Sequence, residues 1–225
     1  MSAPTVLVTG GAGFVGSHTC KALAQAAFLP VTYDNLSNGV VEAVKWGPLE
    51  TGNLHDEARL AAVVARHKPV GVLHFAAFIE AGESVREPVR FFQNNVAGTL
   101  ALLRVMHLAG IDKIVFSSTA AVYGEPEVTP IPETHPLRPM NPYGRSKLMV
   151  EEVLRDVSAA EGLEERHVVV EVEVCFPEVG VKLVNLLGDV LLQKTHKLAA
   201  HLVELGLERV QLAGFRTAVD SPGAA

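Results

Sequence analysis

Short apolar runs alternate with amphipathic stretches along the first part of the chain. Thr5–Thr9 is a β-branched run that ends in glycines, and Phe14–Ala27 follows it with the apolar spacing of a helix. Gly71–Phe75 is a near-continuous apolar run, typical of a parallel strand that is buried on both faces, and Lys113–Ser118 is predicted as the next buried strand. The pattern therefore predicts repeated strand–helix units.

Several of the expected helices have recognisable ends. Asp56–His67 and Pro88–Leu108 have helical spacing, and Gly110 follows the second as an end signal. Asn141 and Pro142 are a capping residue and a residue suited to the first helical position, so a helix is predicted from there to about residue 160. Further extended segments are expected at Val31–Asp34, Gly47–Leu54, His167–Val174 and Arg209–Ala213, and a further helical stretch at Val181–Leu205.

A proline-rich loop is expected between Glu125 and Pro142, because six of the 13 prolines lie there. The strand–helix alternation around it favours an α/β fold, a Rossmann-type doubly wound parallel sheet with helices on both faces. We expect one domain over residues 1–175 and an atypical C-terminal segment over residues 176–225. Whether that segment packs on the sheet is left open.

Composition narrows the functional class. A chain of 225 residues with 48% hydrophobic and 20% charged residues is typical of a folded globular protein. The net charge of −6 argues against a nucleic-acid partner, which basic clusters would bind. No leader pattern and no apolar run of about 18 residues is found, so a cytoplasmic protein without membrane association is expected. Cys20 and Cys175 are interpreted as free thiols, and the nine histidines lack metal-ligand spacing, so no metal is expected.

A glycine-rich turn carries the first chemical signal. Gly10, Gly13 and Gly16 follow a predicted strand and open a predicted helix, a context that favours a diphosphate on the helix N-terminus. Asp34 closes the next strand 18 residues beyond Gly16, where an acidic residue accepts hydrogen bonds from the adenosine ribose. A carboxylate there repels a 2′-phosphate, so NAD is expected as the cofactor rather than NADP.

Tyr143 and Lys147 carry the second signal. They stand four residues apart on the capped helix, so both side chains project from one face. An ammonium beside a phenol favours phenolate and lowers a pKa that is about 10 when unperturbed. The pair therefore predicts a general base.

These motifs belong to a wider set that extends over about the first 163 residues. With that set the chain resembles the UDP-glucose 4-epimerases, which are extended short-chain dehydrogenase/reductases of the NAD-dependent epimerase/dehydratase family. The segments that carry the resemblance are Thr9–Gly16, Tyr33–Asn38, His74–Ala77, Gly82–Ser84, Asn94–Thr99, Phe116–Gly124 and Asn141–Leu148.

The resemblance implies a reaction and roles for three residues. NAD takes a hydride from C4 of a UDP-sugar, the 4-ketose turns over, and the hydride returns to its other face, interconverting UDP-galactose and UDP-glucose. Thr119 would hydrogen-bond the sugar 4-hydroxyl, Tyr143 would take its proton, and Lys147 would hold the nicotinamide ribose and lower the pKa of Tyr143.

The same resemblance implies a set of cofactor-binding positions. Asn53 departs from the family pattern, because relatives usually have Asp there to accept from the adenine amino group, and weaker NAD binding is expected. The full set is Gly10, Gly13, Phe14, Val15, Gly16, Asp34, Asn35, Ser37, Asn38, Gly39, Asn53, Leu54, Phe75, Ala76, Ala77, Phe78, Ile79, Asn95, Tyr143 and Lys147.

The resemblance also implies a homodimer through the helices at Pro88–Leu108 and Asn141–Ala160. It ends beyond about Leu163, where relatives continue into a lobe that closes over the UDP-sugar, so the substrate lobe is expected to be missing. Three functions stay open: a UDP-glucose 4-epimerase, a truncated and catalytically silent NAD-binding protein, or another nucleotide-sugar epimerase or reductase.

Overall fold

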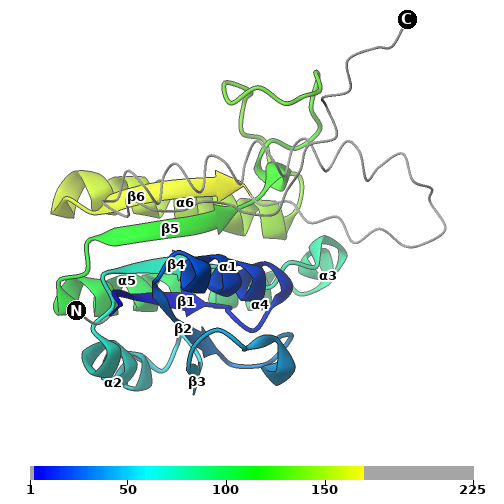
Figure 1. Ribbon diagram of the computed structural model, residues 1–225. Helices are drawn as coiled ribbons and strands as arrows, with labels where there is room; N and C mark the ends of the chain where they lie inside the picture. Colours follow the sequence, from blue (N-terminus) through cyan, green and yellow to red (C-terminus); the bar gives the residue numbers. More distant parts are fainter. Residues whose placement is uncertain (1–2, 170–225) are drawn as a thin grey trace, which may run out of the picture.

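The computed structural model describes residues 3–169, which form a parallel six-stranded sheet flanked by helices (Figure 1). The strand order is β3-β2-β1-β4-β5-β6, and every neighbouring pair is parallel. The strands are β1 (Thr5–Thr9), β2 (Leu29–Asp34), β3 (Leu49–Thr51), β4 (Gly71–His74), β5 (Lys113–Ser118) and β6 (Glu164–Val169). The α-helices are α1 (Phe14–Gln25), α2 (Glu57–His67), α3 (Ala81–Arg86), α4 (Pro88–Phe92), α5 (Gly98–Ala109) and α6 (Pro142–Glu161). Short 3-10 turns are η1 (Val41–Ala43) and η3 (Ala120–Val122), and η2 (Gln93–Ala97) is a π-helical turn.

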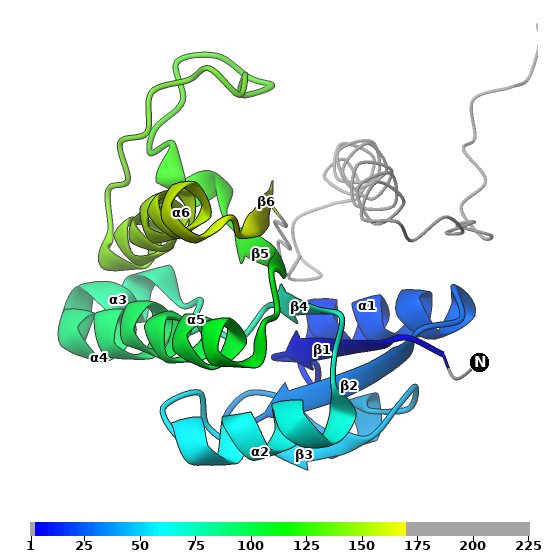
Figure 2. The same ribbon diagram turned by 90° about the vertical axis from the view of Figure 1, so that its left-hand side faces the viewer.

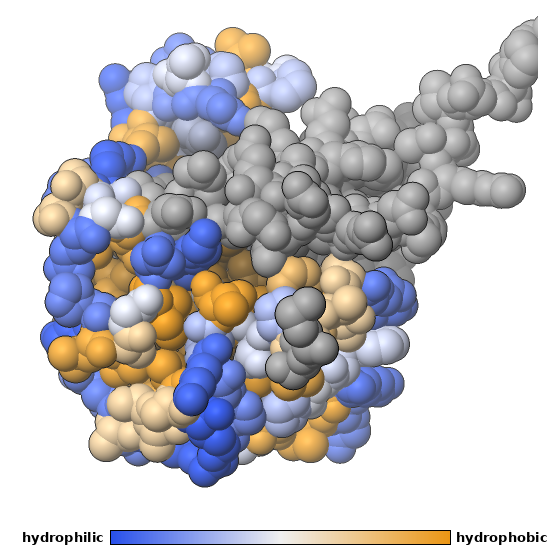
Figure 3. All heavy atoms as spheres, turned by 60° about the vertical axis from the view of Figure 1, so that its left-hand side comes forward, coloured by the Kyte–Doolittle hydropathy of each residue, from blue (hydrophilic) through white to orange (hydrophobic). Residues whose placement is uncertain are grey.

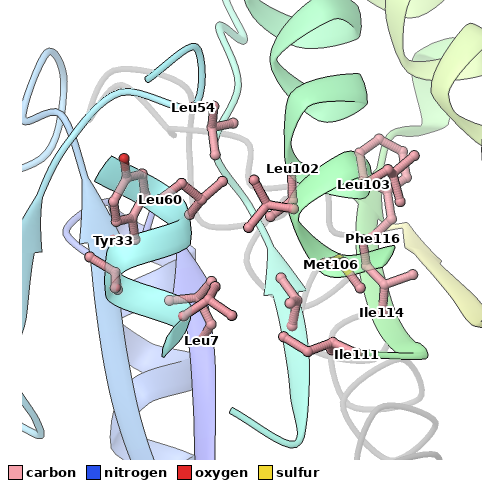
Figure 4. Close-up of a cluster of buried hydrophobic side chains, with 14 of the residues drawn as sticks. Leu7, Tyr33, Leu54, Leu60, Leu102, Leu103, Met106, Ile111, Ile114 and Phe116 are labelled. Atoms are coloured by element: carbon pink, nitrogen blue, oxygen red, sulfur yellow. The ribbon is translucent and has the colours of Figure 1, made fainter. Parts of the chain in front are cut away.

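Alternate residues of the strands point to opposite faces of the sheet, and each face has its own core. Leu7 and Ile114 face a core shared with α2, α5 and α6, whereas Val8 and Val115 face a second core that includes Cys20 and Leu23 of α1. Figure 2 shows α1 and α5 on opposite sides of the sheet, and Figure 4 shows the packing of the larger core. The expected doubly wound arrangement is confirmed.

The expected helix ends are confirmed at three positions. The Asp56 side chain accepts a hydrogen bond from the Arg59 amide at 3.0 Å, and Asn141 Oδ1 accepts from the Gly144 amide at 2.8 Å. Gly110 ends α5 in the left-handed conformation with φ of 69°. Polar side chains thus satisfy N–H groups that a helix start leaves unpaired.

The single helix expected over Pro88–Leu108 is wrong in one respect. The segment consists of α4, the π-helical turn η2 and α5, so one turn holds an extra residue. No Pro or Gly breaks the helical pattern within this turn, which is why the sequence does not reveal it. The turn places Asn95 in the interior, where it is 3% exposed.

The strand expected over His167–Val174 also differs, because β6 begins earlier, at Glu164. Its backbone pairs with β5 from Lys113 to Ser118, and it lies at the edge of the described sheet. The rest of that prediction, and those for residues 181–205 and 209–213, lie outside the described residues.

The proline-rich loop is confirmed. Residues 125–140 form neither a helix nor a strand and project beyond the sheet (green, Figure 1). Within residues 3–169, no helix has the length and apolar character needed to cross a membrane.

Candidate active site

The site lies where β1 and β4 run side by side and the chain leaves them toward opposite faces of the sheet. A parallel sheet of this order opens a crevice at the carboxyl ends of these strands. The glycine turn follows β1 at this point. Gly10 has φ of 73°, and a Cβ there would lie 2.6 Å from the Ala76 amide nitrogen. A Cβ on Gly16 would lie 2.2 Å from the Gly10 oxygen, so both positions require glycine.

The first turn of α1 carries no acidic side chain of its own. The N-cap of the helix, Gly13, has no side chain to bond the first-turn amides. The positive end of the helix dipole and its amide groups therefore face the crevice unmasked, an arrangement suited to an anion. Phe14 and Val15, both expected at this place, form the first turn, and Phe14 is 68% exposed.

Asp34 ties the end of β2 to the glycine turn. Its Oδ2 accepts from the Ala12 amide at 3.0 Å and its Oδ1 accepts from the Leu36 amide at 2.8 Å. Each carboxylate oxygen has a further acceptor site, so the group can still receive hydrogen bonds from ribose hydroxyls. The Val40 amide donates to the Ala12 oxygen at 3.1 Å, which keeps the segment from Asp34 to Gly39 beside the turn. Within that segment, Asn35 Oδ1 accepts from the Ser37 amide, and Asn38 Nδ2 donates to Glu80.

Asn53 and Leu54 lie at the carboxyl end of β3, next to the same crevice. The Asn53 backbone oxygen accepts from the Tyr33 hydroxyl at 2.9 Å, and its Oδ1 accepts from the His55 amide at 3.0 Å. Leu54 is 9% exposed and belongs to the larger core. Both residues therefore also stabilise the segment between β3 and α2.

Asn95 organises the loop that follows β4, which contains Phe75, Ala76, Ala77, Phe78 and Ile79. Its Oδ1 accepts from the Phe78 amide at 2.8 Å, and its Nδ2 donates to the Phe78 oxygen and to Ser146 Oγ, both at 3.0 Å. Both amide hydrogens of Asn95 are therefore used within the protein. Ser146 is a residue that the sequence analysis missed, because nothing near it in sequence indicates a partner on η2.

The predicted catalytic residues come together where β5 ends and α6 begins. Thr119 directly follows β5, is 5% exposed, and its Oγ1 accepts from the Ala121 amide at 3.2 Å. Tyr143 is half-buried in the first turn of α6. Lys147 is 3% exposed, and its Nζ donates to the Ser117 oxygen at 2.8 Å.

Burial changes the electrostatics of Lys147. Loss of hydration lowers the pKa of Lys147 to about 7, and the negative charge of Glu151 opposes this shift. The Lys147 Nζ also lies 4.8 Å from the centroid of the Phe116 ring, an attractive position for a cation. Ser118, which is buried, donates a hydrogen bond to Glu151 Oε1. Neither Glu151 nor Ser118 stands in a sequence pattern that predicts this contact.

His74 forms a buried bridge beneath the glycine turn. Its Nδ1 lies 2.6 Å from Thr9 Oγ1 and its Nε2 lies 2.8 Å from Thr99 Oγ1. The Thr99 hydroxyl donates to the Asn95 oxygen at 2.6 Å, so it accepts from His74, and Nε2 carries the proton. Burial, together with the Lys147 charge, lowers the pKa of His74 to about 3. The ring is therefore a neutral link between β1, β4 and α5.

Among residues 3–169, no three side chains of the His, Cys, Asp and Glu types gather in a way that could hold a metal ion. Taken together, the site combines the start of α1, which suits an anion, with the Asp34 carboxylate, which can accept from ribose hydroxyls. Thr119, Tyr143 and Lys147 complete it.

The sheet order and the glycine turn at its switch point place the domain in the Rossmann class of nucleotide-cofactor folds. The model of the NAD-dependent epimerase/dehydratase family matches residues 6–214, and the chain belongs to that family.

Curated and solved relatives agree with this assignment. A UDP-glucose 4-epimerase from Rhizobium leguminosarum bv. trifolii is 56% identical over 156 residues, 69% of this chain and 48% of that protein. The crystal structure of UDP-glucose 4-epimerase from Brucella ovis in complex with NAD has a TM-score of 0.72 and 46% identity, covering 74% of this chain and 51% of that one. The chain thus spans about half the length of these relatives.

The similarity reaches further along the chain than the sequence motifs indicate. A UDP-glucose 4-epimerase from Azospirillum brasilense is 44% identical over 222 residues, 98% of this chain and 62% of that protein. The match to the Rhizobium relative covers 69% of the chain, in line with the expected extent of the resemblance, whereas the match to this relative and the family model extend beyond Leu163.

Proposed function

We propose that this chain binds NAD and acts as a UDP-glucose 4-epimerase, interconverting UDP-galactose and UDP-glucose. The observation that supports the proposal is the position of Thr119 directly after β5 and of Tyr143 and Lys147 on α6, with Lys147 Nζ bonded to the Ser117 oxygen of β5, beside an intact glycine turn. Relatives named UDP-glucose 4-epimerase support it, and the one from Bifidobacterium longum was crystallised in complex with NAD and UDP.

The residues of the crevice fit NAD. The unmasked start of α1 would hold the diphosphate, and Asp34 would accept hydrogen bonds from the adenosine ribose. The segment Asn35–Gly39 with Asn53 and Leu54 would lie along the adenosine, and Phe75–Ile79 with Asn95 along the path to the nicotinamide. When bound, NAD supplies a group that accepts a hydride from the sugar C4 and returns it.

The catalytic residues would handle the proton. Thr119 and Tyr143 would hydrogen-bond the 4-hydroxyl, and the Tyr143 phenolate would take its proton and later give it back. Lys147 would donate to the nicotinamide ribose, and its positive charge favours the phenolate. Lys147 Nζ donates to the Ser117 oxygen, which keeps it at the strand end where the ribose would arrive.

A second candidate function is the binding of NAD without turnover. One observation favours it: residues 3–169 form the sheet and its helices and include no second domain over the carboxyl ends of the strands. In this proposal residues 1–175 form the NAD-binding domain, and residues 176–225 are a separate segment. Turnover of a different nucleotide sugar is the third alternative, and a substrate panel would detect it.

Calorimetric titration with UDP in the presence of saturating NAD tests the choice. Micromolar UDP binding together with conversion of UDP-galactose into UDP-glucose is the expected result. NAD binding without a UDP signal and without conversion would favour the second candidate function. Failure to bind NAD would overturn both proposals.

We further propose a homodimer formed through α4 to α6 and a cytoplasmic location. Large apolar side chains on these helices are exposed, with Val89 at 74%, Leu108 at 84% and Met149 at 46%. Patches of hydrophobic residues lie between hydrophilic ones on the face shown in Figure 3. Such side chains could be covered by a second copy. Sedimentation velocity of the full chain would show the dimer, and a monomer at micromolar concentration would overturn this part.

A further inference from the structure

One face of α6 carries three polar side chains at successive helical turns. Tyr143, Lys147 and Glu151 are spaced four residues apart, so they line up along the helix. Lys147 is 3% exposed and Glu151 is 8% exposed. A buried carboxylate is rare unless a partner satisfies it, so the burial of Glu151 calls for a reason.

Two consecutive residues of β5 hold this face. The Ser117 oxygen accepts from Lys147 Nζ at 2.8 Å, and the Ser118 hydroxyl donates to Glu151 Oε1. Ser118 is 1% exposed, and the residue after it is Thr119. The two bonds therefore fix the end of β5 against α6 next to the proposed catalytic threonine.

The charges around Lys147 are unequal. Burial and then the Lys147 charge lower the pKa of His74 of β4, so His74 is neutral at physiological pH and adds no charge, and Phe116 of β5 offers only its ring. Tyr143 stands one turn before Lys147 on α6, and Tyr123, at the end of η3, has its pKa raised by burial and then by the Glu151 charge. Glu151 is the anion that favours the charged form of Lys147 against the cost of burial.

We propose that Glu151 is a positioning residue for Lys147: anchored by Ser118, its carboxylate places a fixed negative charge one helical turn from the ammonium group. The assignment rests on the proposed function for its role in catalysis. Its effect on the lysine can be measured without turnover. Removal of the Glu151 charge leaves the Lys147 ammonium buried without a nearby anion, so Lys147 loses its proton at lower pH.

Glu151→Gln is the suitable variant, because the amide oxygen can still accept from Ser118 while the charge is lost. The full chain, labelled with 13Cε-lysine, is titrated by NMR, and the Lys147 signal is assigned by its absence in Lys147→Arg. The midpoint of Lys147 is expected to fall by roughly one pH unit or more in Glu151→Gln. Glu152→Gln, on the exposed neighbouring position, is the matched control and should leave the midpoint unchanged.

An equal midpoint in wild type and Glu151→Gln would overturn the proposal. If Glu151→Gln does not fold, Ser118→Ala replaces it: the charge stays but is no longer anchored, and a change in the Lys147 midpoint is again expected, while no change overturns the proposal.

The catalytic role is tested separately by the pH profile of UDP-galactose turnover. In Glu151→Gln, kcat should fall, and its alkaline limb should move to lower pH with little change in KM. If Glu151→Gln lowers the Lys147 midpoint but the wild-type chain shows no turnover, the electrostatic role of Glu151 is supported and the proposed function is rejected. Turnover with an identical pH profile in both proteins would reject the role of Glu151 alone.

Discussion

Asn95 and Ser146 are joined by a buried hydrogen bond of 3.0 Å from Nδ2 to Oγ, although 51 positions separate them in the sequence. The Ser146 hydroxyl in turn donates to the Tyr143 oxygen at 2.7 Å, within the first turns of α6. Because Asn95 also bonds both polar backbone groups of Phe78, one side chain fixes the π-helical turn, the loop after β4 and the helix that carries Tyr143. The geometry of the candidate site thus depends on a residue with no chemistry of its own.

Asn95→Ala should therefore affect both stability and cofactor binding. The buried Phe78 groups and Ser146 lose their partner, so the free energy of unfolding should fall by about 1–3 kcal/mol. NAD binding should weaken as well, because the loop after β4 is released. Urea unfolding and calorimetry would measure the two effects. Gln93→Ala, at an exposed position of the same turn, is the control, and equal behaviour of the two variants would contradict the prediction.

Gly16→Ala should abolish NAD binding and destabilise the fold. A Cβ at this position would lie 2.2 Å from the Gly10 oxygen, so the glycine turn must open or α1 must move away. Gly82→Ala in α3 is the matched control, because a Cβ there meets no atom within 4 Å. Relief of the helical cost of glycine should leave that variant equally or slightly more stable, by about 0.5–1 kcal/mol. Thermal unfolding with and without NAD would check both, and intact NAD binding in Gly16→Ala would refute the assignment.

Tyr143→Phe should remove turnover and preserve cofactor binding. The phenol is the proposed base for the sugar hydroxyl, and loss of a positioned acid–base group typically lowers a rate by about 10²–10⁴-fold. The ring remains, so the first turn of α6 and the NAD affinity should change little. A coupled assay of UDP-galactose conversion measures the first effect and calorimetry with NAD the second. Retention of more than a tenth of wild-type turnover would exclude Tyr143 as the base.

His74 should stay neutral far below the ordinary range of a histidine. Its pKa is about 3 in the fold against 6.5 for an ordinary histidine, so between these values the unfolded chain binds more protons than the folded one. Stability therefore rises with pH across this window and is lost as pH falls through it, by up to about 5 kcal/mol. Nitrogen NMR should show the Nε2–H tautomer at pH 5. A protonated ring at that pH would contradict the hydrogen-bond assignment.

Glu50→Gln should loosen the edge of the sheet. The Glu50 carboxylate accepts from Arg59 at 2.6 Å, from Arg66 at 2.9 Å and from His67 at 2.7 Å. The His67 bond, followed by the two arginine charges, lowers the pKa of Glu50, so its contribution is present above the unfolded value of 4.5 and is lost as pH falls below it. At neutral pH the variant should lose about 1–3 kcal/mol. Glu42→Gln, at an exposed position, is the control, and equal losses would indicate a general charge effect.

Local signals were sufficient for the elements whose burial and ends are local properties. The bounds predicted for Lys113–Ser118 are those of β5 in the structure, because its consecutive apolar residues Ile114–Phe116 mark a strand that is buried on both faces. The start of α6 followed from Asn141 and Pro142 for a similar reason. The early start of β6 was missed because Glu164–Arg166 carry charges, and pairing with β5 forms the strand regardless.

The residues of the candidate site also fall into two groups, those that a local sequence pattern reveals and those that it does not. The glycine turn, Asp34 and the Tyr143–Lys147 pair were visible because each depends on spacing within one segment. His74, Ser118, Ser146 and Glu151 were missed as site residues because each acquires its role from a partner on another element. A serine or a histidine in an apolar sequence context has no local mark of the residue it will bond.

Because of the π-helical turn Gln93–Ala97, the number of residues between α4 and α5 decides which side of α5 faces the sheet. One residue of an α-helix corresponds to a rotation of about 100°. Deletion of a single residue within the turn would allow α4 and α5 to join as one regular helix, but α5 would then be rotated by about that angle. Leu102 and Met106, now buried against the sheet, would swing away from it. The packing of α5 against the sheet therefore does not tolerate the loss of one residue from this turn.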